Sequence, residues 1–155
     1  MKRNILTMAM VVILGITGFM NWTTSVKAEV VGEDVDLSSI FTEEALIGYA
    51  ELQSRGIYLV GGYSIINKIS STKVGAGGVT EAAIRCTVRV NPVLEQKKNG
   101  SWARVTSWSQ MNQNALSATI SKSVTVDRGY YYRVSSYHYA SSDTTYSGTN
   151  ALCMN

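Results

Sequence analysis

Residues 84–91 of this 155-residue chain, IRCTVRVN, decide the fold class, because apolar and polar side chains alternate at every position. Ile84, Cys86, Val88 and Val90 take one set of positions, and Arg85, Thr87, Arg89 and Asn91 take the other. A period of two is that of a β-strand with one buried and one solvated face. Pro92 follows and predicts the end of the strand or a bend, since proline cannot donate to a ladder.

The Asn99–Gly100 pair predicts a tight hairpin after this strand, because both turn positions need positive φ. The returning strand is predicted at residues 102–108. Further strands are predicted at 57–59, 65–69, 120–126, 130–139 and 144–153, and the glycine-rich residues 75–78 are predicted to form a turn. About seven short strands separated by turn residues are typical of an antiparallel sandwich. We therefore predict an all-β, immunoglobulin-like β-sandwich domain over residues 55–155.

Residues 127–131, DRGYY, have the spacing of the turn and tyrosine that precede strand F in immunoglobulin-like domains. There a tyrosine hydroxyl bonds back to the chain across the corner. The pattern leaves open whether Tyr130 or Tyr131 is the corner residue. Arg133 stands where antibody domains carry a cysteine, so their inter-sheet disulfide is absent.

The first 28 residues have the pattern of a signal peptide. Lys2 and Arg3 precede an apolar run over residues 5–19, and the small residue Ala28 suits cleavage after it. The run is shorter than the ~20 residues that cross a bilayer. We therefore expect a secreted protein without stable membrane insertion.

Charge divides the rest of the chain into two parts. Residues 29–54 hold seven acidic and no basic side chains, whereas residues 55–155 hold eleven basic and four acidic ones, a net charge of +7. We predict a disordered or short-helical acidic segment at 29–54, with a helix from about Ser38 to Leu52 capped by Ser39 or Thr42. Either the basic part meets an anionic surface, or the acidic segment folds back on it or is a removed pro-segment.

Four motifs resemble those of an uncharacterised family of small secreted proteins of Gram-positive bacteria, the domain of unknown function 6147. They are residues 55–59 (RGIYL), 99–102 (NGSW), 129–134 (GYYYRV) and 137–138 (YH). The resemblance covers residues 46–150. It implies a secreted β-rich module with no assigned activity, and it supplies no catalytic residues.

The sequence gives little support to an enzyme. It has a single histidine, His138, which excludes a multi-histidine metal site, and it has no nucleophile elbow or phosphate-binding loop. We expect no catalytic residues, no cofactor and no metal. Cys86 and Cys153 are expected either to form a disulfide outside the cell or to be two buried free thiols.

Aromatic residues give the better lead to function. Tyr131, Arg133, Tyr137 and Tyr139 are predicted to share one face of the strand at 130–139, opposite Tyr132, Val134 and His138. An exposed row of tyrosines beside arginine has the composition of a recognition surface. Tyrosine ladders also simply stabilise sheets.

The function predicted from these features is a secreted, non-catalytic module that binds a cell-wall polymer, a glycan or another anionic surface of the cell envelope or a host, and no nucleic acid. The alternative is a secreted antagonist or bacteriocin-like protein that acts on anionic membranes once it is freed from its acidic segment. The sequence leaves the oligomeric state open.

Overall fold

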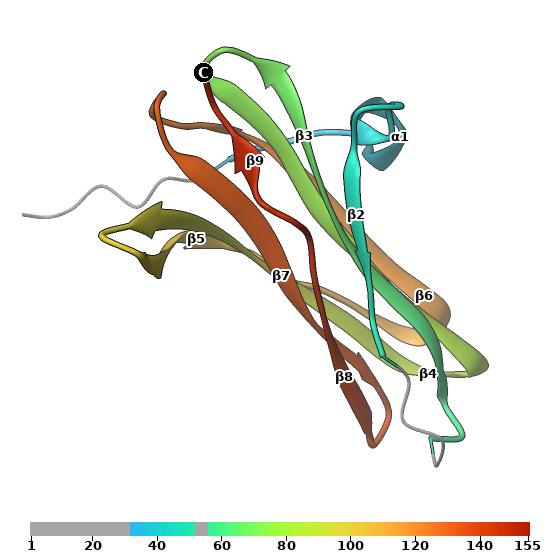
Figure 1. Ribbon diagram of the computed structural model, residues 1–155. Helices are drawn as coiled ribbons and strands as arrows, with labels where there is room; N and C mark the ends of the chain where they lie inside the picture. Colours follow the sequence, from blue (N-terminus) through green and yellow to red (C-terminus); the bar gives the residue numbers. More distant parts are fainter. Residues whose placement is uncertain (1–31, 52–55) are drawn as a thin grey trace, which may run out of the picture.

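The computed structural model describes residues 32–51 and 56–155. The predicted signal peptide, its cleavage after Ala28 and the predicted start of the β-domain at residue 55 lie outside the described residues. The elements, in chain order, are β1 (Glu33–Asp34), α1 (Leu37–Ile40), β2 (Leu46–Tyr49), β3 (Leu59–Ser70), β4 (Lys73–Lys98), β5 (Ser101–Ser107), β6 (Gln110–Thr125), β7 (Tyr131–Ala140), β8 (Asp143–Gly148) and β9 (Leu152–Cys153). The all-β prediction is confirmed (Figure 1).

A single strand, β4, is the spine of the fold and is 26 residues long. Along one edge it pairs with β3 at residues 73–82 and then with β7 at residues 88–96. Along the other edge it pairs with β6 and then with β5. All nine described strands therefore belong to one antiparallel sheet, where two separate sheets were expected.

The sheet curves so that its two halves face each other. Ser64 of β3 lies 2.7 Å from Ser136 of β7 and 2.7 Å from Ser147 of β8, measured between the hydroxyl oxygens. Figure 1 shows β7 and β8 passing beside β3, with β8 also beside β2. The main core lies between the halves and contains Ile66, Val74, Ala76, Leu94, Val124, Val126, Tyr132, Val134 and Met154.

The turn predicted for residues 75–78 is wrong. These residues lie in the middle of β4 and pair with both β3 and β6. A Cβ on Gly75 would overlap Ile40 of α1, and one on Gly78 would lie 2.8 Å from the Ser136 hydroxyl oxygen. Glycine is needed here because other parts of the chain approach both faces of the strand closely.

The two other signals along β4 had different outcomes. The Asn99–Gly100 hairpin is confirmed, with φ values of 51° and 83° in the turn between β4 and β5. Pro92, in contrast, does not end the strand. Its carbonyl accepts a hydrogen bond from the Trp108 amide, 3.2 Å away, at the junction between β5 and β6. The N and C=O of one strand residue point to the same edge, so the proline ring faces this junction, where no ladder bond is lost.

The described part of the acidic segment, residues 32–51, is folded onto the basic part of the chain. β1 pairs with β6, and β2 pairs with β3. Asp34 forms an ion pair with Lys122 at 3.2 Å, and Ile40 is fully buried. The predicted helix is shorter and starts earlier, because Asp36 caps it by accepting a hydrogen bond from the Ser38 amide.

The corner tyrosine is Tyr132, where Tyr130 or Tyr131 was expected. Its hydroxyl donates to the Asp127 carbonyl at 3.0 Å and accepts from Gln96 Nε2 at 2.7 Å. Tyr130 and Tyr131 are exposed: Tyr131 points to the opposite side of β7, and Tyr130 precedes the strand.

Cys86 and Cys153 are both free thiols, each partly buried, so of the two expected states the structure has the thiols and no disulfide. Cys86 lies just before Val88, which pairs with Ala140 at one end of β7, and Cys153 pairs with Tyr131 at the other end. A ten-residue strand is ~30 Å long, whereas bridged Cα atoms lie within ~7 Å of each other. The two thiols are too far apart to pair within the chain.

Candidate binding face on strands β4, β5, β7 and β8

Strand β7 presents alternate residues to its two sides. Tyr131 and Tyr137 are each half exposed on the outer side, together with the partly buried Arg133 and Tyr139. Tyr132, Val134 and His138 point inward and are buried. The four residues predicted as a ligand-binding row therefore lie on one outer surface of the sheet.

Strand register adds neighbours that the sequence did not indicate. Glu95 lies opposite Arg133, Arg89 opposite Tyr139, and Tyr146 opposite Tyr137. On β5, Arg104 pairs with Glu95 and Trp102 with Lys97. We call the resulting surface the Arg–Tyr face; it comprises Arg89, Glu95, Lys97, Trp102, Arg104, Tyr131, Arg133, Tyr137, Tyr139 and Tyr146. It carries four basic side chains and a single acidic one.

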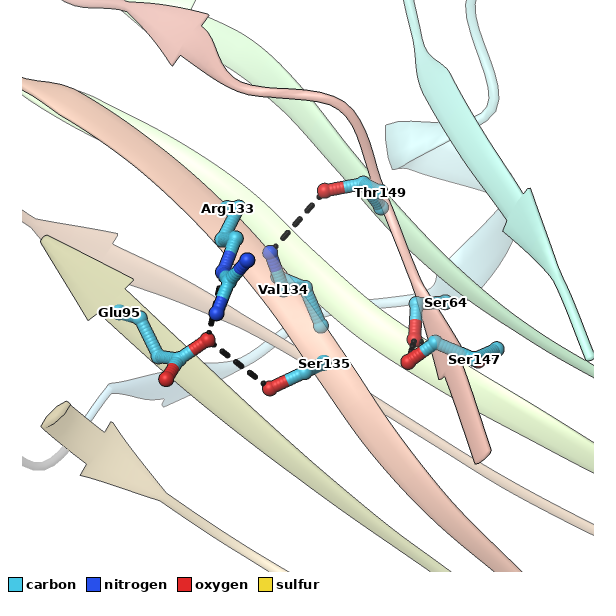
Figure 2. Close-up of polar contacts among 7 residues, drawn as sticks. All are labelled: Ser64, Glu95, Arg133, Val134, Ser135, Ser147 and Thr149. Carbon is cyan, nitrogen blue, oxygen red and sulfur yellow. Dashed lines mark hydrogen bonds and ion pairs between the residues drawn. The ribbon is translucent and has the colours of Figure 1, made fainter. Parts of the chain in front are cut away.

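Arg133 is held in place by two neighbours. Its Nε donates to Glu95 Oε2 at 2.8 Å, and its guanidinium carbon lies 4.3 Å from the centre of the Trp102 ring. Ser135 donates to the same Glu95 oxygen at 3.1 Å, which fixes the carboxylate (Figure 2). The terminal Nη1 and Nη2 groups of Arg133 have no hydrogen-bond partner within residues 32–51 and 56–155. The guanidinium is thus oriented while most of its donors stay free.

The other end of the Arg–Tyr face repeats this combination of a cation and a ring. The Arg89 guanidinium lies 4.1 Å from the centre of the Tyr139 ring. Between the two arginine sites, Tyr137 and Tyr146 form an edge-to-face pair with ring centres 5.5 Å apart. Such contacts each contribute about 0.5–1.5 kcal/mol and hold the side chains in defined positions.

A second polar cluster lies inside the protein, around His138. The ring Nδ1 is 2.8 Å from the Thr80 hydroxyl, and Nε2 is 2.7 Å from the Ser147 hydroxyl. The Thr80 hydroxyl donates its hydrogen bond to the Arg89 carbonyl, so it accepts one from Nδ1–H of His138. Nε2 is then unprotonated and accepts a hydrogen bond from the Ser147 hydroxyl. Burial lowers the pKa of His138 to about 4.

This His138 cluster has the residue types of a nucleophilic site but the position of a core contact. His138, Thr80 and Ser147 are each at most 2% exposed. Together with Ser64 and Ser136 they join β3 and β4 to β7 and β8 across the two halves of the sheet. The arrangement satisfies buried polar groups, and it offers no surface to a substrate.

Two further properties concern ligands and membranes. Within residues 32–51 and 56–155, no three His, Cys, Asp or Glu side chains gather closely enough to hold a metal ion. The same described part of the chain contains no helix with the length and apolar character needed to cross a membrane.

Glu95, Lys97, Trp102, Arg89 and Arg104 were missed in the sequence, although one signal could have found four of them. Counting outward from the Asn99–Gly100 turn pairs Lys97 with Trp102 and Glu95 with Arg104, which places these four side chains on one face. The partners of Arg133 and Tyr139 depend on the pairing of β7 with β4, which no local signal gives.

Comparison with known proteins supports one assignment. No curated protein and no solved structure matches the chain. A family model described as a family of unknown function, DUF6147, matches residues 37–154, a wider range than the expected 46–150. The match begins with α1 and includes all strands from β2 to β9, and hence the whole Arg–Tyr face. The chain therefore belongs to the DUF6147 family of unknown function.

Proposed function

We propose that this protein is a secreted, non-catalytic module that binds an anionic ligand of the cell envelope or of a host surface through its Arg–Tyr face. The observation that carries the proposal is the state of Arg133. Glu95 and Trp102 hold its guanidinium, and its Nη groups remain free. A fixed guanidinium binds carboxylate or phosphate through two parallel hydrogen bonds at a low entropic cost.

The surroundings of Arg133 favour the same class of ligand. Arg104 and Lys97 lie on neighbouring strands of the Arg–Tyr face. The single carboxylate of this face, that of Glu95, already accepts hydrogen bonds from Arg133 and Ser135. Positive potential on this surface attracts anions and speeds their association. Rigid aromatic side chains beside the charges supply contact area without much loss of rotamer freedom.

Secretion and Gram-positive origin are parts of the proposal supported by the sequence. The pattern of residues 1–28 is that of a cleaved signal peptide, and the motif resemblance points to secreted proteins of Gram-positive bacteria. The non-catalytic part is supported by the interior position of His138, the single histidine of the chain.

The alternative, an antagonist acting on anionic membranes, is less favoured by the fold. It requires release of the acidic segment from the basic part. In the folded protein this segment contributes the buried Ile40 and two paired strands, β1 and β2. Removing a buried isoleucine contact alone costs about 2–5 kcal/mol, so release would destabilise the domain.

Binding of the secreted chain to purified Gram-positive cell wall and to anionic polysaccharide tests the proposal. Arg133→Gln is expected to weaken binding about tenfold or more, the loss of one charge-assisted pair. Arg85→Gln is the matched control, because Arg85 is an exposed arginine outside the Arg–Tyr face. Equal effects of the two substitutions, or no retention on any anionic material, would contradict the proposal.

A further inference from the structure

The side chains of the Arg–Tyr face follow a fixed order along β7. Arg133, with its Glu95 and Trp102 neighbours, occupies one end. Next comes a row of small side chains that crosses four strands, formed by Ser107, Val93, Ser135 and Gly148. The Tyr137–Tyr146 pair follows, and Arg89 with Tyr139 forms the other end.

The length of this arrangement restricts the ligand. Residues 133 and 139 are six positions apart on one strand, so the two arginine sites are separated by ~20 Å. A free phosphate or a single lipid headgroup cannot reach both. A ligand that contacts both arginines must be an extended chain with negative charges spaced along it.

Glu95 restricts the ligand further. Its Oε2 accepts from Arg133 and Ser135, while Oε1 has no partner in the part of the chain that the structure describes. A free carboxylate oxygen accepts hydrogen bonds from hydroxyl groups and repels any anionic group placed directly against it. A ligand lying here therefore needs hydroxyls beside its charges, which sugar chains have and polyphosphate lacks.

The tyrosine pair supplies the third requirement. Tyr137 and Tyr146 are 50% and 46% exposed, and they flank the row of small side chains. Half-exposed rings bind the apolar face of a sugar ring, while their hydroxyls stay in water. Tyr146 reaches over Gly148 of this row, with its hydroxyl oxygen 3.4 Å from the position of a Cβ there, so the ring pair borders the small side chains between Arg133 and Tyr137.

From this order we infer that the ligand of the Arg–Tyr face is an acidic glycan that lies along β7. Its negative groups pair with Arg133 and Arg89, and a sugar ring between them stacks on Tyr137 and Tyr146. The inference rests on the proposed function and specifies its ligand class. Carboxylated and phosphorylated sugar chains share this chemistry.

Calorimetric titration of the secreted chain with four probes separates these cases. The probes are oligogalacturonates of increasing length, a sugar-bearing teichoic acid, polyphosphate, and anionic phosphatidylglycerol vesicles. We expect affinity for oligogalacturonate or teichoic acid to rise with chain length up to a span of ~20 Å, the separation of the arginine sites, and to exceed the affinity for polyphosphate and vesicles.

Substitutions distinguish failure of this inference from failure of the proposed function. Tyr137→Ser and, independently, Tyr146→Ser should weaken glycan binding about tenfold and change polyphosphate binding less than twofold, because they remove stacking and no charge. Arg133→Gln should weaken the binding of every anion, and Arg85→Gln of none. Both tyrosines are half exposed, so we expect the variants to remain folded. Melting curves check this.

Several results would overturn the inference while leaving anion binding intact. The first is that the tyrosine variants lose polyphosphate binding and glycan binding equally. The second is that polyphosphate or the vesicles bind as tightly as both glycans. The third is that neither glycan binds although another anion does. Unchanged binding of all probes by Arg133→Gln would overturn the proposed function itself.

Discussion

Tyr132 makes two hydrogen bonds in the core that neither adjacent tyrosine makes. Its hydroxyl joins Gln96 of β4 to the carbonyl of Asp127, at the turn that precedes β7. Burial raises the pKa of this hydroxyl, so it remains protonated and able to donate. The sequence predicts that a tyrosine hydroxyl bonds back across this turn, but it contains three consecutive tyrosines. Which of them points inward depends on the residue at which β7 begins, and the sequence does not give that residue.

Removing only this hydroxyl tests its role. Tyr132→Phe should lower the free energy of unfolding by about 1–2 kcal/mol, because Gln96 Nε2 then lacks its partner in a buried site. Chemical denaturation measures the change. Tyr131→Phe is the control, since Tyr131 is exposed, and it should alter stability by less than ~0.5 kcal/mol. Equal effects would show that the corner bond contributes nothing specific.

His138 makes the stability of the protein depend on pH. The pKa of its imidazole is about 4 in the folded protein because of burial, against 6.5 for a free side chain. Between these values the unfolded chain binds more protons, so stability is complete above pH 6.5 and decreases as pH falls to about 4. The expected loss is about 3 kcal/mol.

Measurements of unfolding at a series of pH values check this expectation. In His138→Asn the part of the slope between pH 6.5 and about 4 should disappear, although the variant is less stable throughout. Because the chain has one histidine, an NMR titration reports this imidazole alone. A titration midpoint near the ordinary value of 6.5 in the folded protein would contradict the argument.

At the level of elements, β4 shows what local sequence predicts and what it does not. The Asn99–Gly100 turn was predictable because positive φ is a property of those two residues. The length of β4 was not. Residues 75–78 look like a turn in the sequence, and their need for glycine comes from Ile40 and Ser136, which are distant in the chain. The same limit applies to the Arg–Tyr face. Its β7 residues follow from alternation, but the placement of Glu95 and Trp102 beside Arg133 depends on the pairing of β7 with β4, which is distant in the chain.

A substitution inside the glycine stretch tests the close packing of β4. A Cβ on Gly77 would lie 2.7 Å from the Ile120 carbonyl oxygen, so Gly77→Ala should cost about 1–3 kcal/mol through overpacking. At Gly148 the nearest atom would be the Tyr146 hydroxyl at 3.4 Å, and Gly148→Ala should be nearly neutral. Thermal unfolding compares the two variants. A Gly77→Ala protein as stable as the control would mean that the strands are not packed this closely.

At the scale of the whole molecule, the acidic and basic parts form one body. Ile40→Ala should lower the free energy of unfolding by about 2–5 kcal/mol, because Ile40 is fully buried against β4. The transition should remain single when it is followed by fluorescence and by circular dichroism. Phe41→Ala, at a side chain that is 42% exposed, is the milder control. An unchanged midpoint for Ile40→Ala would show that the acidic segment folds independently of the sheet.

The free thiols give a second test at this scale. Alkylation of the unfolded protein without reducing agent should modify both Cys86 and Cys153 in every chain, because ~30 Å of strand separates them. Mass spectrometry counts the added groups. A species that takes no label until it is reduced, and that remains monomeric, would contradict the strand pairing at both ends of β7.

The central position of β4 also affects the order in which the protein can be completed. A ribosome releases β4 long before its last partner, since β7 ends 42 residues after Lys98. At a translation rate of ~5–20 residues per second, the edge of β4 that pairs with β7 stays unpaired for roughly 2 to 8 s. An open strand edge is a template for pairing with other chains. Until β7 has emerged, from the ribosome or during the proposed export, this edge of β4 can pair with other newly made chains, and slower emergence lengthens the exposure.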